Sequence, residues 1–322
     1  MTTHQRTASA TGAVPTVNGV AVPDVSAGFG AAVWTAAVLA GALGTVPRAL
    51  ALAPLVLVPL GIGLVGRRPF PGPSGRLLAA AVWLQPVGAL LFTASLALPV
   101  DGVPAAGLAA PWLLVTGLLG LTALFRTVDR GGLALPATAV DAGLAYVSVG
   151  AVAMLLFHLD ITFWFGSTII LLTAVHFHYA GFVLPVMTGL TGYTGQLGSP
   201  TWRRLVGVIL AGPAIIAVGI SFSPLVEVLA VGGFTVAVAL FGWYVVLRVA
   251  PTRPRAQGVL LGASAVALPV SMALALGYGI ATFSGLALGL DIATMVALHG
   301  SLNAFGFALL GLVGWRLAVP TD

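Results

Sequence analysis

Cysteine and lysine are absent from this chain of 322 residues, and charged residues of any kind are scarce. Without cysteine there can be no disulfide, thiolate metal site, iron–sulfur cluster or thiol nucleophile, and without lysine no side-chain amine can form a Schiff base. Charged residues make up 7% of the chain and hydrophobic residues 59%, whereas soluble domains carry about 25% charged residues. The composition therefore excludes a water-soluble fold and predicts a protein of the cell membrane.

Apolar runs recur along the chain, each near or above the ~20 residues that an α-helix needs to cross about 30 Å of hydrocarbon. We therefore predict an all-α, polytopic transmembrane helical bundle of about ten spans. The predicted spans cover residues 28–46, 49–65, 77–98, 105–125, 136–157, 163–190, 204–222, 225–248, 257–277 and 291–315. Residues 27–322 would form this multi-pass domain. Residues 1–26 contain no apolar signal-peptide segment and are expected to be a disordered cytoplasmic tail.

The arginines predict the orientation, because cytoplasmic loops of membrane proteins are enriched in basic residues. With ten spans and a cytoplasmic N-terminus, twelve of the thirteen arginines fall on the cytoplasmic side and only Arg48 falls outside. We therefore expect both termini in the cytoplasm. The arginines stand singly or in pairs at the ends of apolar runs, so the expected partner is the lipid bilayer and no nucleic acid is expected.

Polar groups within the predicted spans are few, and each is a candidate for function because burying it in hydrocarbon is costly. The sixth span carries His176 and His178, the tenth carries His299 and Asn303, and the fifth carries Asp141. Helical rise places them about 12 to 23 Å from the outer ends of their spans. We therefore predict that they meet in one layer as catalytic residues. The alternative for Asp141 is a position at the cytoplasmic interface, near a helix start.

The local geometry of the sixth span is a second expectation. His299 and Asn303 are four residues apart and share a helix face, but His176 and His178 are separated by about 200° on an ideal helix. Either one of them faces another neighbour, or the helix is irregular here. Pro185 favours irregularity, because it cannot donate to the carbonyl of Gly181 and would clash with it.

Aromatic residues near the polar groups are candidates to line an apolar substrate pocket, although aromatics at helical spacing also serve as ordinary packing. The substrate-binding candidates are Tyr179, Phe182, Tyr146 and Phe305.

The segments His176-Phe-His-Tyr-Ala-Gly-Phe and His299-Gly-Ser-Leu-Asn-Ala-Phe-Gly-Phe resemble the YndJ-like family of bacterial polytopic membrane proteins. The resemblance covers these two segments and the helical layout. It implies a multi-pass membrane protein, in a family that sometimes carries a transporter label without an established substrate.

Three functions fit these residues, and the first is preferred. It is a membrane-embedded enzyme that performs cofactor-independent acid–base chemistry, namely isomerisation, hydration or cyclisation, on a lipophilic small molecule, since histidine titrates near neutrality. The second is a proton-coupled secondary transporter that uses the same residues. The third is a haem or metal protein, in which His178, His299 and Asp141 would form a mixed site. The histidine spacing is not a helical chelate, so no metal ligand is predicted.

Overall fold

The structure, a computed structural model, describes residues 14–195 and 199–319. In these residues ten helical segments are long and apolar enough to cross a membrane, as predicted. The first five are α1 (Val22–Leu39), α2–η1–α3 (Thr45–Leu52, Ala53–Leu57, Val58–Val65), α4 (Gly72–Ala97), α5 (Gly102–Asp129) and α6 (Ala137–His158). The other five are α7–η2–α8 (Ser167–His178, Tyr179–Val183, Leu184–Gly192), α9 (Pro200–Phe222), α10–η3–η4 (Pro224–Tyr244, Val245–Val249, Ala250–Thr252), α11 (Arg255–Ser284) and α12–η5–η6–α13 (Ile292–Met295, Val296–Gly300, Leu302–Leu309, Leu310–Leu317).

The N-terminal segment differs from the prediction. Strands β1 (Thr16–Val17) and β2 (Val20–Ala21) form a short antiparallel hairpin, and α1 begins at once, with Val22, Pro23 and Ser26 buried. Asn18 and Gly19 make the turn with positive φ angles, which suit an Asn-Gly hairpin. The expectation of disorder is therefore wrong for residues 14–26, and residues 1–13 lie outside the described part of the chain.

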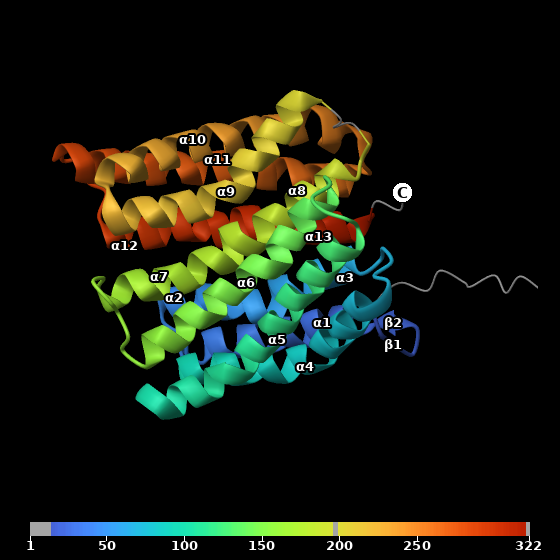
Figure 1. Ribbon diagram of the computed structural model, residues 1–322. Helices are drawn as coiled ribbons and strands as arrows, with labels where there is room; N and C mark the ends of the chain where they lie inside the picture. Colours follow the sequence, from blue (N-terminus) through green and yellow to red (C-terminus); the bar gives the residue numbers. More distant parts are fainter. Residues whose placement is uncertain (1–13, 196–198, 320–322) are drawn as a thin grey trace, which may run out of the picture.

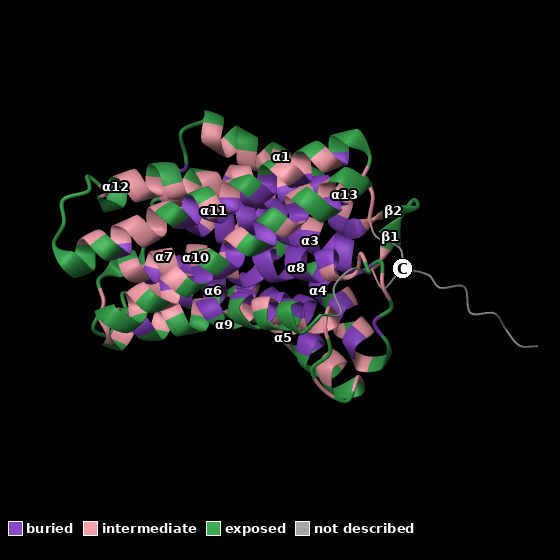
Figure 2. Ribbon diagram, turned by 90° about the horizontal axis from the view of Figure 1, so that it is seen from above, coloured by how far each residue is buried: buried purple, intermediate pink, exposed green. Residues whose placement is uncertain are grey.

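The second span, α2–η1–α3, lies at the centre of the bundle. Of its most apolar 18-residue window, 83% is buried, more than in any other described span. Figure 1 shows α4 and α5 on one side of the molecule and α9, α10 and α11 on the other, and Figure 2 shows buried residues concentrated around α3 and α8. Because lipid is as apolar as leucine, close packing of such central spans is what holds a membrane bundle together.

An ion pair ties the first span to the last. Arg316 of α13 donates from Nε to Oδ1 of Asp24 in α1 over 2.7 Å, and its Nη2 donates to the second carboxylate oxygen. The hairpin and the end of α13 lie at the same end of the bundle (Figure 1), as an even number of crossings requires.

Five segments of the described chain are π-helical, and three of them end two residues before a proline: Leu57 before Pro59, Val183 before Pro185, and Val249 before Pro251. A proline has no N–H, and its ring clashes with the carbonyl four residues earlier in an α-helix. A π turn pairs residues five apart instead of four, so it changes the position of that carbonyl relative to the ring. The predicted irregularity after His178 is thus confirmed as η2.

In the π segment η1 the carbonyl of Pro54 lacks its helical donor. In the i to i−5 hydrogen-bond pattern of a π-helix the donor would be the N–H of Pro59, and proline has no N–H. The side-chain amide of Gln85 in α4, which is buried, donates to the Pro54 oxygen over 2.8 Å. Ser26 of α1 donates in turn to the Gln85 amide oxygen. This chain of hydrogen bonds joins α1, η1 and α4 in the core, where an unpaired polar group would be destabilising.

Candidate functional site

His176 and His299 face each other across the interface between α7 and η5. Their ring centroids lie 6.1 Å apart, with the ring planes inclined by 37°. Helical rise places His176 about 14 Å from Ser167 and His299 about 10 Å from Ile292, the first residues of their spans. His176 is shallower than predicted, because its helix begins four residues later than expected.

The imidazole of His176 is anchored through one nitrogen only. Its Nδ1 lies 2.7 Å from the carbonyl oxygen of Leu172, and since a carbonyl only accepts, Nδ1 carries the proton. In the neutral imidazole the other nitrogen, Nε2, has a lone pair, and it has no hydrogen-bond partner within residues 14–195 and 199–319. The residue is exposed on the surface of the bundle. In its neutral form this imidazole is fixed in place and has an accessible basic nitrogen.

His299 is held through both of its nitrogens. Its Nδ1 lies 2.9 Å from the carbonyl oxygen of Ser271 in α11 and 2.9 Å from the hydroxyl oxygen of the same residue. The amide Nδ2 of Asn303 donates to His299 Nε2 over 3.1 Å. With Nε2 accepting and Nδ1 donating to the Ser271 carbonyl, His299 is neutral in this arrangement. Asn303 keeps a second amide hydrogen and its oxygen for other partners.

The local backbone brings His299 against α11. The π segments η5 and η6 lie on either side of Ser301, and such segments occur frequently at functional sites. Gly306 in η6 permits the close approach, because a Cβ there would lie 2.9 Å from the Cβ of Ala267. The structure thus brings three of the predicted site residues together: His176, His299 and Asn303.

His178 belongs to a different part of the molecule. Trp112 Nε1 donates to its Nε2 over 2.9 Å, and its Nδ1 donates to the Ala174 carbonyl over 2.7 Å. It is fully buried, stacks on Trp112 and contacts Phe92. At Gly150 a Cβ would lie 2.6 Å from the imidazole. His178 therefore has no free nitrogen, and its predicted convergence with His176 is wrong because the two residues point to different sides of α7.

Asp141 lies near the start of α6, at the end of the bundle away from His176. Its carboxylate bonds to Arg126 and to Arg130, each over 2.7 Å, and accepts from the Thr127 hydroxyl over 3.3 Å. The predicted convergence with the histidines is wrong for Asp141, and the alternative of an interfacial position describes it better. His178, His299 and Asp141, considered above for a mixed metal site, thus have separate partners.

The four predicted substrate-binding aromatics also have separate partners. The hydroxyl of Tyr146 donates to the carbonyl of Leu210, and that of Tyr179 to the carbonyl of Ala49 in α2. Phe182 is fully buried, with its ring close to Gly61, and Phe305 packs on Trp34 with ring centroids 6.0 Å apart. Their contacts are those of packing and hydrogen bonding between helices.

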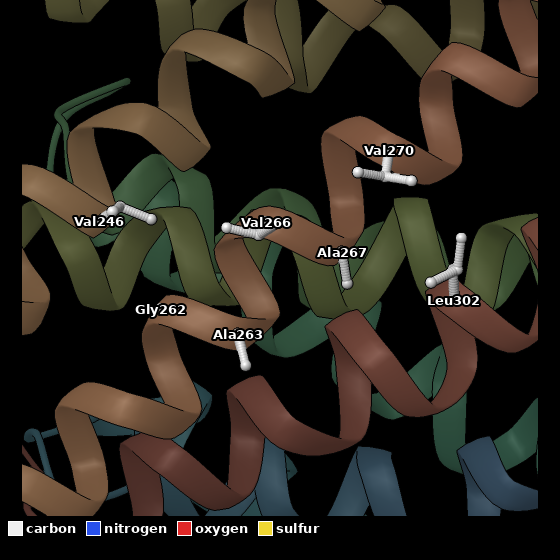
Figure 3. Close-up of a pocket in the computed structure, with 7 residues that line it drawn as sticks. All are labelled: Val246, Gly262, Ala263, Val266, Ala267, Val270 and Leu302. Atoms are coloured by element: carbon white, nitrogen blue, oxygen red, sulfur yellow. The ribbon is translucent and has the colours of Figure 1, made fainter.

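An apolar groove of about 540 Å³ lies between η3, α11 and η6. Figure 3 shows its lining side chains, all of them aliphatic. Two of these, Val270 and Leu302, are the immediate sequence neighbours of Ser271 and Asn303. Successive residues of a helix point about 100° apart, so the groove and the polar cluster occupy different faces of α11 and η6, and none of the cluster's side chains lines the groove.

The sequence analysis did not predict four residues that contact the candidate site residues, namely Arg126, Arg130, Ser271 and Trp112. The spacing of Arg126 and Arg130 could have predicted that they act together, since residues four apart share a helix face. The predicted span ended at residue 125, however, whereas α5 continues to Asp129. Ser271 and Trp112 are single polar groups within apolar spans, and nothing in their sequence spacing distinguishes them.

Comparison with known proteins places the chain in a family. The sequence model of the family described as YndJ-like protein matches residues 48–307, which is most of the chain. The chain belongs to the YndJ-like family. It is 34% identical over 220 residues to a protein of Bacillus subtilis (strain 168) named "Uncharacterized membrane protein YndJ".

The aligned region covers 67% of this chain and 40% of that relative, so the YndJ-like chain spans less than half the length of the relative it matches. No solved structure matches the chain. Together with the ten membrane-capable helices, family membership establishes a multi-pass membrane protein.

Proposed function

We propose that this membrane protein is an enzyme that moves a proton on a lipophilic substrate, with His176 as the base. The observation that carries the proposal is the unpaired, accessible Nε2 of an imidazole whose Nδ1–H is fixed on Leu172. Histidine is the side chain best suited to give and take a proton near neutral pH. The other candidates for this role, His178 and His299, have both nitrogens occupied.

The reaction that these groups favour is isomerisation by a single base. The substrate C–H bond breaks, its proton passes to His176 Nε2, and the electron pair moves into an adjacent conjugated system. The proton then returns from Nε2 to another carbon, so atoms and charge balance without a cofactor. The free amide hydrogen of Asn303 is a donor for an oxygen that becomes negative during the transfer. Hydration and cyclisation have less support, because they require a second proton carrier.

The substrate class follows from the surroundings. His176 is exposed on the side of an apolar bundle, and an aliphatic groove is lined in part by Val270 and Leu302, the sequence neighbours of Ser271 and Asn303. Entry from the bilayer favours a lipophilic molecule. The scarcity of polar groups along the spans offers less support for a transport path through the protein.

Solvent exchange tests the proposal without a known substrate. The purified full-length protein would be incubated in D2O with a total bacterial membrane lipid extract, and deuterium bound to carbon would be measured by mass spectrometry. We expect incorporation into one lipid species, reduced at least about a hundredfold by His176→Asn, as expected for loss of a general base. His158→Asn, which changes a histidine bonded to Ser95, is the control and should retain exchange.

Either absence of exchange by the wild-type protein or full exchange by His176→Asn would contradict this function. Movement of a chemically unchanged solute across proteoliposomes, with no deuterium incorporated, would support the transporter in its place.

We also propose that both termini are cytoplasmic. The support is the distribution of arginines, since Arg126 and Arg130 at the end of α5 and Arg316 near the end of α13 lie toward the end of the bundle that carries the β1–β2 hairpin, and basic residues favour the cytoplasmic side.

A further inference from the structure

A second groove, of about 630 Å³, opens between α9 and α10 and continues to η3. One end is polar, with Arg204 near the start of α9, Arg248 in η3 and the hydroxyl-bearing residue Thr201. The remainder is lined by apolar or small residues such as Val208, Val236 and Gly233. Because α9 and α10 are antiparallel neighbours (Figure 1), the start of one and the end of the other lie together.

The two arginines are uncompensated cations. Both are exposed, and neither has an ion pair or side-chain hydrogen bond among the described residues, unlike Arg126, Arg130 and Arg316, which bind carboxylates. Two guanidinium groups at the mouth of one groove match an anion that offers several oxygens, because guanidinium pairs with phosphate through two parallel hydrogen bonds.

The length of the groove matches one leaflet of a bilayer. From Arg248 back to Gly233 is fifteen residues of helix, which is about 22 Å by helical rise, and half of a bilayer with its headgroups is about 20 to 23 Å. Trp202 packs on Tyr244 beside the arginines, with ring centroids 5.6 Å apart, and Trp243 is 66% exposed. Tryptophan and tyrosine gather at the membrane–water interface, which sets the level of the headgroup.

We propose that this groove is a binding site for an anionic phospholipid. The phosphate of the headgroup binds Arg204 and Arg248, and one acyl chain lies along the apolar channel past Val236 to Gly233. Basic pockets between helices recognise anionic headgroups in this way. The charge of the mouth and the wholly apolar body together select a lipid over a free anion or a zwitterionic lipid.

The headgroup contact is tested by titrating the detergent-solubilised full-length protein with dioleoyl phosphatidylglycerol and following its thermal stability. We expect Arg204→Gln with Arg248→Gln to weaken the apparent affinity about 30-fold, from about 1 kcal/mol for each arginine. Arg203→Gln is the matched control, because Arg203 is exposed and adjacent but does not line the groove. Its affinity should stay within about twofold of wild type.

The apolar channel is tested independently of charge. A Cβ at Gly233 meets no atom within 4 Å, so a larger side chain has room to begin there and Gly233→Leu is expected to extend into the channel. We expect it to weaken phosphatidylglycerol binding about tenfold, the effect of about 1.4 kcal/mol. Gly207→Leu is the control, since Gly207 also has open space and lies outside the lining.

Three results would overturn the proposal: equal affinity for dioleoyl phosphatidylcholine, equal stabilisation by inorganic phosphate alone, or an Arg203→Gln loss as large as that of the double variant. A dimer whose formation buries the groove and excludes phosphatidylglycerol would overturn it as well.

Discussion

Replacing Asp141 with asparagine should strongly destabilise the protein, because this one carboxylate holds two arginines. Its two oxygens lie 2.7 Å from Arg126 and 2.7 Å from Arg130, and its side chain is only 5% exposed. The arginine side chains are 11% and 22% exposed. Asparagine keeps the shape but removes the charge, and leaves two partly buried cations side by side.

The expected loss is about 3–5 kcal/mol of unfolding free energy, the range for removing one partner from a buried ion pair. The chain offers a matched control in Asp24→Asn. Its ion pair with Arg316 is more exposed, at 20% and 24% of the two side chains, so we expect a loss of about 1 kcal/mol or less. The two variants change the same chemical group by the same number of atoms.

The measurement is equilibrium unfolding of both variants in mixed micelles of mild detergent and sodium dodecyl sulfate. A triple variant, Asp141→Asn with Arg126→Gln and Arg130→Gln, removes all three charges and should recover much of the loss, since the cost comes from unpaired charge. If Asp141→Asn is no more destabilising than Asp24→Asn, or if the triple variant is worse than the single one, the reasoning is wrong.

Two further predictions use the absence of cysteine and the space around His178. A single cysteine that replaces Leu286, which is 57% exposed between α11 and α12, should react with a membrane-impermeant maleimide in intact cells. A single cysteine that replaces Leu133, which is 81% exposed between α5 and α6, should react only after permeabilisation. The reverse labelling pattern would show that the orientation is opposite to the proposed one. Gly150→Ala should lower the unfolding free energy by about 1–3 kcal/mol, because its Cβ would lie 2.6 Å from His178 Nδ1. Gly117→Ala, whose Cβ would meet no atom within 4 Å, should be neutral or stabilising by up to about 1 kcal/mol. Equal effects of the two variants in unfolding experiments would refute this account of Gly150.

The grouping of the polar residues was predictable in part. His299 and Asn303 were expected to share a face, and they do, with an amide–imidazole bond of 3.1 Å. The opposite directions of His176 and His178 also follow from helical geometry, because two residues turn an ideal helix by about 200°. Which of the two would meet His299 was not predictable, since that depends on the neighbour on each side of α7.

The helix around Pro185 has one feature that follows from the chemistry of proline and one that follows only from packing. A missing N–H and a ring clash are properties of proline itself, so irregularity after His178 could be inferred from the chain alone. The irregularity takes the form of the π segment η2, which places the Tyr179 hydroxyl on the Ala49 carbonyl of a helix 130 residues away in sequence. No local rule predicts that contact.

The sequence by itself determined that this is a multi-pass membrane protein with about ten apolar helices long enough to span a bilayer, because a span must hide every peptide group in a helix and present apolar side chains over a fixed thickness. That requirement applies to each segment separately, so the residues of a segment alone are enough to predict a span. Only the tertiary structure decided that Asp141 binds two arginines, that Trp112 occupies His178, and that His176 keeps a free nitrogen. Those outcomes depend on side chains that meet across different helices, and a contact between helices is a property of the packed bundle as a whole.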